Sequence, residues 1–210
     1  MYFTKIPPFI QEMFKNYLWH GDRSKKEVFL TFDDGPHPES TPFILDILST
    51  YKVQATFFCL GENIEKYPQL FQRIKEEGHQ VGNHSYSHLS GWSTSTKKYV
   101  DDVNHANKLI NSKLFRPPYG RITPQQAKVL SKNYKIVMWD VMPGDFDERR
   151  TEKEVVNNVI RHMDCGSVIV LHDFLFEHAK NEIFFPQLLD KISEADYTFS
   201  LIKSLCDCQP

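Results

Sequence analysis

Two adjacent carboxylates, Asp33 and Asp34, directly follow a run of apolar residues in this sequence. Gly35 and Pro36 come next and indicate a turn, so the pair lies where a buried strand is expected to end. Two neighbouring carboxylates repel each other, and this repulsion costs energy at the end of a buried strand. A cation that binds one of them would relieve the repulsion. The pair is therefore a candidate for metal binding or for proton transfer.

Imidazole groups follow two other apolar runs. His84 and His88 stand four residues apart after one run, and His172 ends another. One carboxylate and two imidazoles form a three-ligand set with open positions, which is the arrangement of catalytic zinc sites. A structural zinc site would need a fourth ligand, usually cysteine, and no cysteine stands near these residues in the sequence. Adjacent strand-end residues point in different directions, so one aspartate could bind a metal while the other takes a proton from water.

Each of these signals also has an ordinary structural explanation. An Asp pair can cap backbone groups, two histidines can lie in an exposed loop, and Arg116 can form a surface salt bridge. His172 taken alone is more typical of a hydrogen-bonded core histidine. The joint occurrence favours a functional site, because structural needs alone rarely place polar reactive groups after five successive apolar runs.

Seven short apolar runs predict the strands that would position these groups. Several are continuously apolar, as expected of strands that are covered on both faces. Strands that alternate with helices indicate βαβ units and a parallel sheet, and seven such units indicate a closed or nearly closed barrel. Active sites of α/β barrels lie at the carboxyl ends of the strands, where the polar groups gather. The predicted strands are 26–32, 55–61, 79–83, 113–118, 135–141, 166–173 and 197–202.

Helical patterns lie between these strands. Thr41 followed by Pro predicts the start of one helix, and Thr151 with Glu154 predicts a capping box. A third helix is expected to run without a break over 63–77 and to end at Gly78. The predicted helices are 41–51, 63–77, 95–112, one after Thr123, one after Thr151, and 184–195.

Length and composition narrow the class of protein. A chain of 210 residues with 40% hydrophobic residues predicts one domain with a sizeable core. The net charge of −2 gives no support for nucleic acid as a partner. No apolar run is long enough to span a membrane, and the N-terminus lacks the pattern of a signal peptide. The expected location is therefore cytoplasmic or peripheral to the cell envelope.

The chain is divided into three parts on this basis. Residues 1–25 are interpreted as an N-terminal arm, residues 26–205 as the domain, and residues 206–210 as a tail. The apolar and aromatic stretch 6–19 is expected to pack on the domain, with a peripheral membrane contact as the alternative.

Five motifs resemble those of the polysaccharide deacetylases, which are carbohydrate esterase family 4 with its NodB-homology domain. The resemblance implies a single α/β domain with a distorted (β/α)7 barrel, in agreement with the seven predicted strands. It also implies metal-dependent removal of N-acetyl groups from N-acetylglucosamine units of peptidoglycan or chito-oligosaccharides, although some members remove O-acetyl groups from xylan. The motifs are TFDDG (31–35), HSYSH (84–88), RPPYG (116–120), Trp139 to Phe146, and Leu171-His172.

Matching by position implies a role for each site residue. Asp33 would be the general base, oriented by Arg116, and the backbone N–H of Tyr119 would complete the oxyanion hole. His172 would be the general acid, and Asp145 would raise its pKa. The implied metal ligands are Asp34, His84 and His88.

The fourth motif departs from the D-x-x-D-W pattern of many members. Met142 replaces the first Asp and Phe146 replaces the Trp, whereas Asp145 is retained. Because Asp145 is retained, we expect activity to survive. Because Phe146 alters the wall of the acetyl pocket, we expect substrate preference to differ. The residues expected to contact substrate are Tyr119, Phe146 and Trp92.

Other functions remain open at this point. Two histidines and one carboxylate also form the facial triad of non-haem iron oxygenases, in which Asp33 would have no role. Zinc is favoured because hydrolysis uses both a base and an acid, and cobalt, manganese or nickel could replace it. A non-catalytic carbohydrate-binding relic would be expected to have lost at least one of the key residues. The expected partner is an acetylated amino-sugar polymer or oligomer, and the oligomeric state is not predicted.

Overall fold

The computed structural model describes the backbone of residues 2–173 and 178–202, and the side chains of all of these except 178–183. All seven predicted strands are present, although three of them consist of only two residues. The strands are β1 Glu27–Asp33, β2 Thr56–Cys59, β3 Gln80–Asn83, β4 Leu114–Phe115, β5 Lys135–Ile136, β6 Ser167–His172 and β7 Thr198–Phe199.

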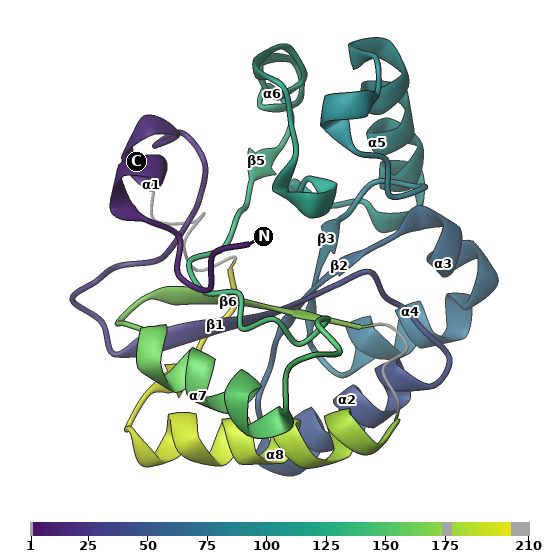
Figure 1. The fold of residues 1–210 in the computed structure, drawn as a ribbon. Coiled ribbons are helices and arrows are strands. Elements are labelled where there is room, and N and C mark those ends of the chain that lie inside the picture. The colour runs from purple at the N-terminus through teal and green to yellow at the C-terminus, as the bar shows by residue number, and fades with distance from the viewer. Residues whose placement is uncertain (1, 174–177, 203–210) are drawn as a thin grey trace.

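Within the described residues these strands form one parallel sheet. Its order is β5-β4-β3-β2-β1-β6, and β7 pairs with the start of β1. In Figure 1, α7 and α8 lie beneath β6 and β1, while α5 and α6 stand at the opposite end of the sheet. The predicted α/β domain with a distorted (β/α)7 barrel is confirmed. The helices are α1 Pro8–Met13, α2 Ser40–Tyr51, α3 Gly61–Lys66, α4 Pro68–Glu76, α5 Thr96–Ile110, α6 Pro124–Leu130, α7 Glu152–His162 and α8 His178–Glu194.

Helix boundaries agree with the sequence where a capping box is present. Thr151 accepts a hydrogen bond from the backbone N–H of Glu154, and the Glu154 side chain accepts one from the backbone N–H of Thr151. The same reciprocal pair joins Thr123 and Gln126 at the start of α6. Each box satisfies two backbone donors that a helix N-terminus leaves without partners.

Two helix predictions are wrong in detail. The helix expected over 63–77 is two helices, because the proline ring of Pro68 is tolerated in the first turn of α4 and not inside a continuous helix. Tyr67 stands between them with φ −132° and ψ 57°. Helix α2 begins at Ser40 and not after a Thr41 cap. The Thr41 hydroxyl instead donates a hydrogen bond to Asp173.

The sheet is apolar on both faces, which explains the continuous apolar run of β1. Val28 and Leu30 point into the core between the sheet and helices α2 and α8. Phe29 points into a second core on the other face of the sheet. That second core includes Trp19 from the N-terminal arm and Phe115 from β4. Helices and arm thus cover the two faces of a buried parallel strand.

Strand register brings the polar carboxyl ends together. Asp33 lies opposite His172 in the β1–β6 pair. Asn83, the last residue of β3, lies opposite Cys59 of β2 on one side and Phe115 of β4 on the other. The loops that follow these strands therefore leave the sheet at the same edge.

The N-terminal arm fills the seam between β5 and β6. Isolated bridges pair Leu18 with Val137, which follows β5, and His20 with Ser167 at the start of β6. A third bridge joins Lys5 to Val141. The arm is seen in purple beside β5 in Figure 1. The boundary at residue 25 stays a prediction, and the predicted tail 206–210 lies outside the described residues.

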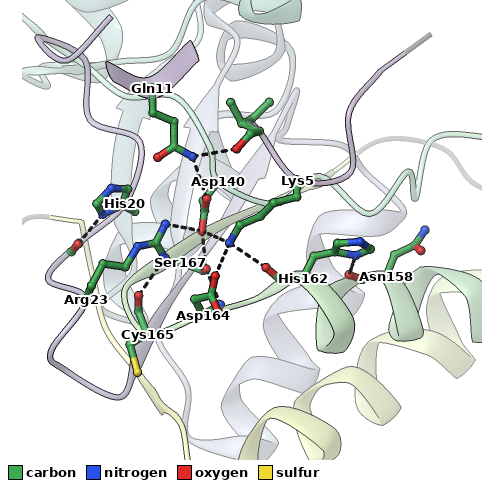
Figure 2. A network of polar contacts seen from close by, with 12 residues as sticks. Lys5, Gln11, His20, Arg23, Asp140, Asn158, His162, Asp164, Cys165 and Ser167 are labelled. Atoms are coloured by element: carbon green, nitrogen blue, oxygen red, sulfur yellow. Dashed lines mark hydrogen bonds and ion pairs between the residues drawn. The ribbon is translucent and has the colours of Figure 1, made fainter. Parts of the chain in front are cut away.

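The buried carboxylate of Asp140 fastens the arm to the barrel (Figure 2). Lys5 Nζ lies 2.8 Å and Arg23 Nη2 3.0 Å from Asp140 Oδ2, and Gln11 donates to Oδ1 at 3.0 Å. Burial alone would raise the pKa of Asp140, but hydrogen bonds from Lys5 and Ser167 and the charge of Arg23 lower it. Removing one of these partners would leave part of the buried negative charge of Asp140 without a compensating positive charge, which is energetically costly. The contacts to Asp140 therefore hold the arm in place.

Candidate active site

Three predicted metal ligands converge at the carboxyl edge of the sheet. Asp34 directly follows β1, and His84 and His88 follow β3. Asp34 Oδ1 lies 3.3 Å from His84 Nε2 and 3.1 Å from His88 Nε2. One ligand atom from each residue lies within 4.8 Å of the others, so the group could hold a metal ion.

The hydrogen bonds around His84 favour a cation at this point. His84 Nδ1 lies 2.9 Å from the carbonyl oxygen of Arg116, which only accepts, so Nδ1 carries the proton. In neutral His84 the Nε2 lone pair then faces the carboxylate of Asp34. Asp34 Oδ1 is buried and has no hydrogen-bond donor among the described residues. Buried acceptors that face each other fit a shared metal ion, and a backbone carbonyl on the far nitrogen is the usual support of a metal-binding histidine.

Backbone conformation aims these side chains. Asp34 has φ 77°, His88 has φ 56° and Tyr119 has φ 59°, all in the left-handed region that non-glycine residues seldom adopt. Asn63 holds the loop by donating to the carbonyl of Asp34 at 2.7 Å. Ser85 accepts from the backbone N–H of His88 at 3.1 Å. Such conformations persist only where surrounding contacts fix them, and they cluster at functional sites.

Asp33 is held by a fully buried arginine. Arg116 Nη1 lies 2.7 Å from Asp33 Oδ1 and donates to Thr31 Oγ1 at the same distance, while Nη2 donates to the carbonyl of Met138 at 2.9 Å. The second oxygen, Asp33 Oδ2, lies 3.9 Å from His84 Nε2. One carboxylate oxygen is thus fixed by Arg116 and the other lies on the side of the candidate metal ligands.

His172 is paired with Asp145. Its Nδ1 lies 3.0 Å from Asp145 Oδ1, and its backbone N–H donates to Asp145 Oδ2 at 2.7 Å. Burial alone would lower the pKa of His172, but the charge and hydrogen bond of Asp145, with smaller contributions from Asp34 and Asp33, raise it to about 9. A pKa of about 9 would keep His172 protonated at neutral pH, which is the state that a general acid requires.

One cavity of about 350 Å³ joins these groups. Tyr119 and Phe146 line it, as expected for substrate contacts, and Tyr119 packs on His88 with ring centroids 4.4 Å apart. Trp92 does not line it: this side chain is 69% exposed and stacks on Arg121. The lining residues are Tyr2, Asp33, Asp34, His84, His88, Tyr119, Arg121, Trp139, Met142, Phe146, Val170 and His172.

The sequence motifs assign no role to Tyr2 and Asp173, which lie beside the site. Tyr2 reaches the cavity from the N-terminal arm. Asp173, fully buried, accepts hydrogen bonds from Ser40 at 2.7 Å and Thr41 at 2.6 Å, and burial raises its pKa to about 7. A Cβ at Gly35 would lie 2.2 Å from Asp173 Oδ2, so only glycine fits there. Asp173 follows His172 directly and could have been suspected, whereas no local signal marks Tyr2.

A comparison with protein families agrees with this geometry. The model of the family described as polysaccharide deacetylase matches residues 20–137, more than half of the chain. The chain belongs to the polysaccharide deacetylase family. Among curated members, a peptidoglycan-N-acetylglucosamine deacetylase of Bacillus cereus is 39% identical over 183 residues. That match covers 84% of this chain, and the chain spans 65% of the relative's length.

Solved deacetylase structures share the fold over most of their length. A peptidoglycan N-acetylglucosamine deacetylase in complex with 4-naphthalen-1-yl-N-oxidanyl-benzamide is 34% identical, with a TM-score of 0.84 over 95% of this chain and 97% of that one. A CE4 family pseudoenzyme from Bacillus anthracis is 26% identical, with a TM-score of 0.80 over 89% of this chain and 67% of that one. Because the fold is shared with a pseudoenzyme, activity has to be argued from the site.

Proposed function

We propose that this polysaccharide deacetylase removes N-acetyl groups from N-acetylglucosamine units of peptidoglycan or chito-oligosaccharides in a metal-dependent hydrolysis. The observation that carries the proposal is the meeting of a three-ligand group with the carboxylate of Asp33 and the Asp145-bound imidazole of His172 in one cavity. The name of the Bacillus cereus relative supports an N-acetylglucosamine substrate.

Asp34, His84 and His88 would hold the metal, and zinc is the ion that this ligand set favours. When bound, zinc polarises a carbonyl and lowers the pKa of water towards ~7. Cobalt, manganese or nickel could replace it. The iron oxygenase alternative is disfavoured, because it leaves the Arg116–Asp33 pair and the His172–Asp145 pair without a task.

Asp33 is proposed as the general base. Its charge is held by Arg116, which donates to one oxygen at 2.7 Å and leaves the side chain directed towards the candidate metal ligands. From there Asp33 would take the proton of the water that attacks the acetyl carbonyl. A fixed base of this kind needs no reorganisation as the reaction proceeds.

His172 is proposed as the general acid, which protonates the leaving amine. Asp145 binds Nδ1, so the proton to be transferred is the one on Nε2. An amine is a poor leaving group without that proton, so turnover would depend on protonated His172. The backbone N–H of Tyr119, in its left-handed conformation, is proposed as the donor that stabilises the oxyanion, and such a donor is typically worth ~3 kcal/mol.

A peptidoglycan substrate would place the reaction at the cell envelope. Among the described helices, none has both the length and the apolar character that crossing a bilayer requires. We infer action on envelope polymers from the proposed substrate.

The proposal is tested by acetate release. Protein treated with a chelator and then supplied with zinc is incubated with N-acetylglucosamine oligomers, peptidoglycan or acetylxylan. We expect acetate from the first two substrates, strict dependence on added metal, and no requirement for oxygen. Release from acetylxylan alone would show that the protein is an O-acetyl esterase and not an amidase. Release from none of the substrates would indicate a pseudoenzyme.

A further inference from the structure

The N-terminal arm reaches into the candidate active site through Tyr2. The Tyr2 ring packs edge-on against Phe146 with centroids 4.9 Å apart, and Phe146 packs edge-on against His172 at 5.1 Å. Tyr2 lines the same cavity as the candidate metal ligands. Three rings thus connect the arm to the candidate general acid, although Tyr2 lies outside the range matched by the family model.

Two hydrogen bonds hold the hydroxyl group of Tyr2. Tyr2 Oη donates to Asp147 Oδ2 at 3.2 Å and accepts from Arg150 Nε at 3.4 Å. Gly144, with φ 85°, provides the space: a Cβ there would lie 2.1 Å from Tyr2 Oη. These contacts hold the ring at the cavity wall, because the polar end of the side chain is bound and the apolar part faces Phe146.

The arm itself is anchored next to Tyr2. The Thr4 carbonyl accepts from the backbone N–H of Met142 at 2.8 Å, and the backbone N–H of Ile6 donates to the Asp140 carbonyl at 3.0 Å. Lys5 lies between them in the sequence, and its Nζ is 2.8 Å from both Asp140 Oδ2 and Asp164 Oδ2. Figure 2 shows this side chain directed at the two carboxylates. The segment that leads to Asp145 and Phe146 is therefore held in register with the arm.

We propose that Tyr2 is a substrate-contacting residue that determines which ligands the active site accepts. The inference rests on the proposed function for the identity of the substrate. Tyr2, Phe146 and Met142 form an apolar wall of the cavity, and this wall suits the C–H face of a sugar ring next to the scissile amide. We expect a small ligand held only by the candidate metal ligands to make no contact with Tyr2, and a ligand that fills the cavity to contact it.

The first test separates binding from turnover. Tyr2→Ala should raise KM for N-acetylglucosamine oligomers about three- to tenfold, the range expected for one aromatic contact, and leave kcat within about twofold. Tyr2→Phe, which retains the ring and removes only its hydroxyl contacts, should raise KM less than Tyr2→Ala does. Phe9→Ala is the matched control, because Phe9 is an exposed aromatic residue of the same arm that does not line the cavity. A fall in kcat at unchanged KM would overturn the proposal, since it would show that Tyr2 acts only by supporting Phe146 and His172.

The second test does not depend on deacetylase activity. Calorimetry measures the Kd of acetohydroxamate and of 4-phenylbenzohydroxamate for the zinc-loaded protein. We expect Tyr2→Ala to weaken the larger probe by a similar three- to tenfold (about one aromatic contact) and to leave acetohydroxamate unchanged. Unchanged binding of both probes, or equal weakening of both, would overturn the proposal. If the wild type releases no acetate, the proposed function fails while the two probes still decide the role of Tyr2.

Discussion

The adjacent aspartates Asp33 and Asp34 have the same chemistry and different partners. Asp33 Oδ1 is bound by the buried guanidinium of Arg116, whereas Asp34 Oδ1 faces two imidazole nitrogens and no hydrogen-bond donor within the described part of the chain. The repulsion between the two carboxylates is thus opposed by a fixed positive charge on one side. On the other side the ligand atoms of Asp34, His84 and His88 lie close enough together to hold a cation.

Conservative substitutions should separate the two aspartates. Asp34→Asn should weaken zinc binding strongly, because it removes the anionic ligand. Asp33→Asn should retain zinc and lose most turnover, because the amide cannot accept the proton. Equilibrium dialysis with zinc and acetate release measure the two properties. Equal zinc affinity of both variants would contradict the assignment of Asp34 as the ligand.

The pH dependence of activity should report His172. Since its pKa is raised to about 9 and the acid must be protonated, kcat/KM should fall as the pH rises through that region. Asp145→Asn removes the largest contribution that raises this pKa, so the alkaline limb should move to lower pH by at least about one unit. His172→Ala should lose most turnover at every pH. A limb that does not move in Asp145→Asn would show that another group titrates there.

Most of the individual site residues could be predicted from the sequence, because they lie at strand ends and within compact motifs. The structure brings Asp34, His84 and His88 together and places Asp33 and His172 beside them. Tyr2 could not be predicted, since it reaches the site through pairing of the arm with residues far away in the chain. Trp92 was expected at the substrate and lies outside the cavity lining, against Arg121. Its contact with substrate stays a prediction.

At the level of elements, strands and capped helices were predictable from local pattern. Continuous apolar runs predicted β1 and β6. A capping-box pattern predicted the start of α7, and Thr123 followed by proline predicted the start of α6. The break at Pro68 was missed, because the apolar spacing on the two sides of the proline is compatible with one helix. The start of α2 was missed because Thr41 uses its hydroxyl for Asp173, a contact that only the tertiary structure creates.

The seam between β5 and β6 should depend on Lys5. Lys5→Met removes three hydrogen bonds to Asp140, Asp164 and the His162 carbonyl, and it should lower the free energy of unfolding by about 1–3 kcal/mol. Lys66→Met is the matched control: it breaks a surface i,i+4 pair with Glu62 and should cost at most about 0.5 kcal/mol. Urea unfolding measures both. Equal losses would mean that the buried cluster does not fasten the arm.

For the whole molecule, the parallel sheet determines where an active site can form, but it does not determine whether the protein is active. The same fold is found in a peptidoglycan deacetylase and in a CE4 family pseudoenzyme. In this chain the carboxyl edge of the sheet holds a complete set of candidate groups, contributed by the last residues of β1 and β6 and by the loops after β1, β3, β4 and β5. Because those loops come from most of the chain, the site exists only when the sheet is assembled.

Metal binding should therefore stabilise the entire fold. A zinc concentration one hundred times the Kd should add about 2.7 kcal/mol to the free energy of unfolding, since the ligands meet only in the folded chain. For a domain of this size the Tm should rise by roughly 5–10 °C. Differential scanning calorimetry of the wild type and of Asp34→Asn, with and without zinc, measures the effect. An equal rise in Tm in the variant would place zinc elsewhere.

The position of Tyr2 has a practical consequence for work with the protein. A polypeptide joined ahead of residue 2 would be attached to a residue that lines the cavity, where an oligohistidine leader could bind the proposed metal ion or obstruct entry of a glycan. Kinetic constants measured on such a fusion would describe the leader as much as the enzyme. Preparations for assay should have that extension cleaved off before metal is added.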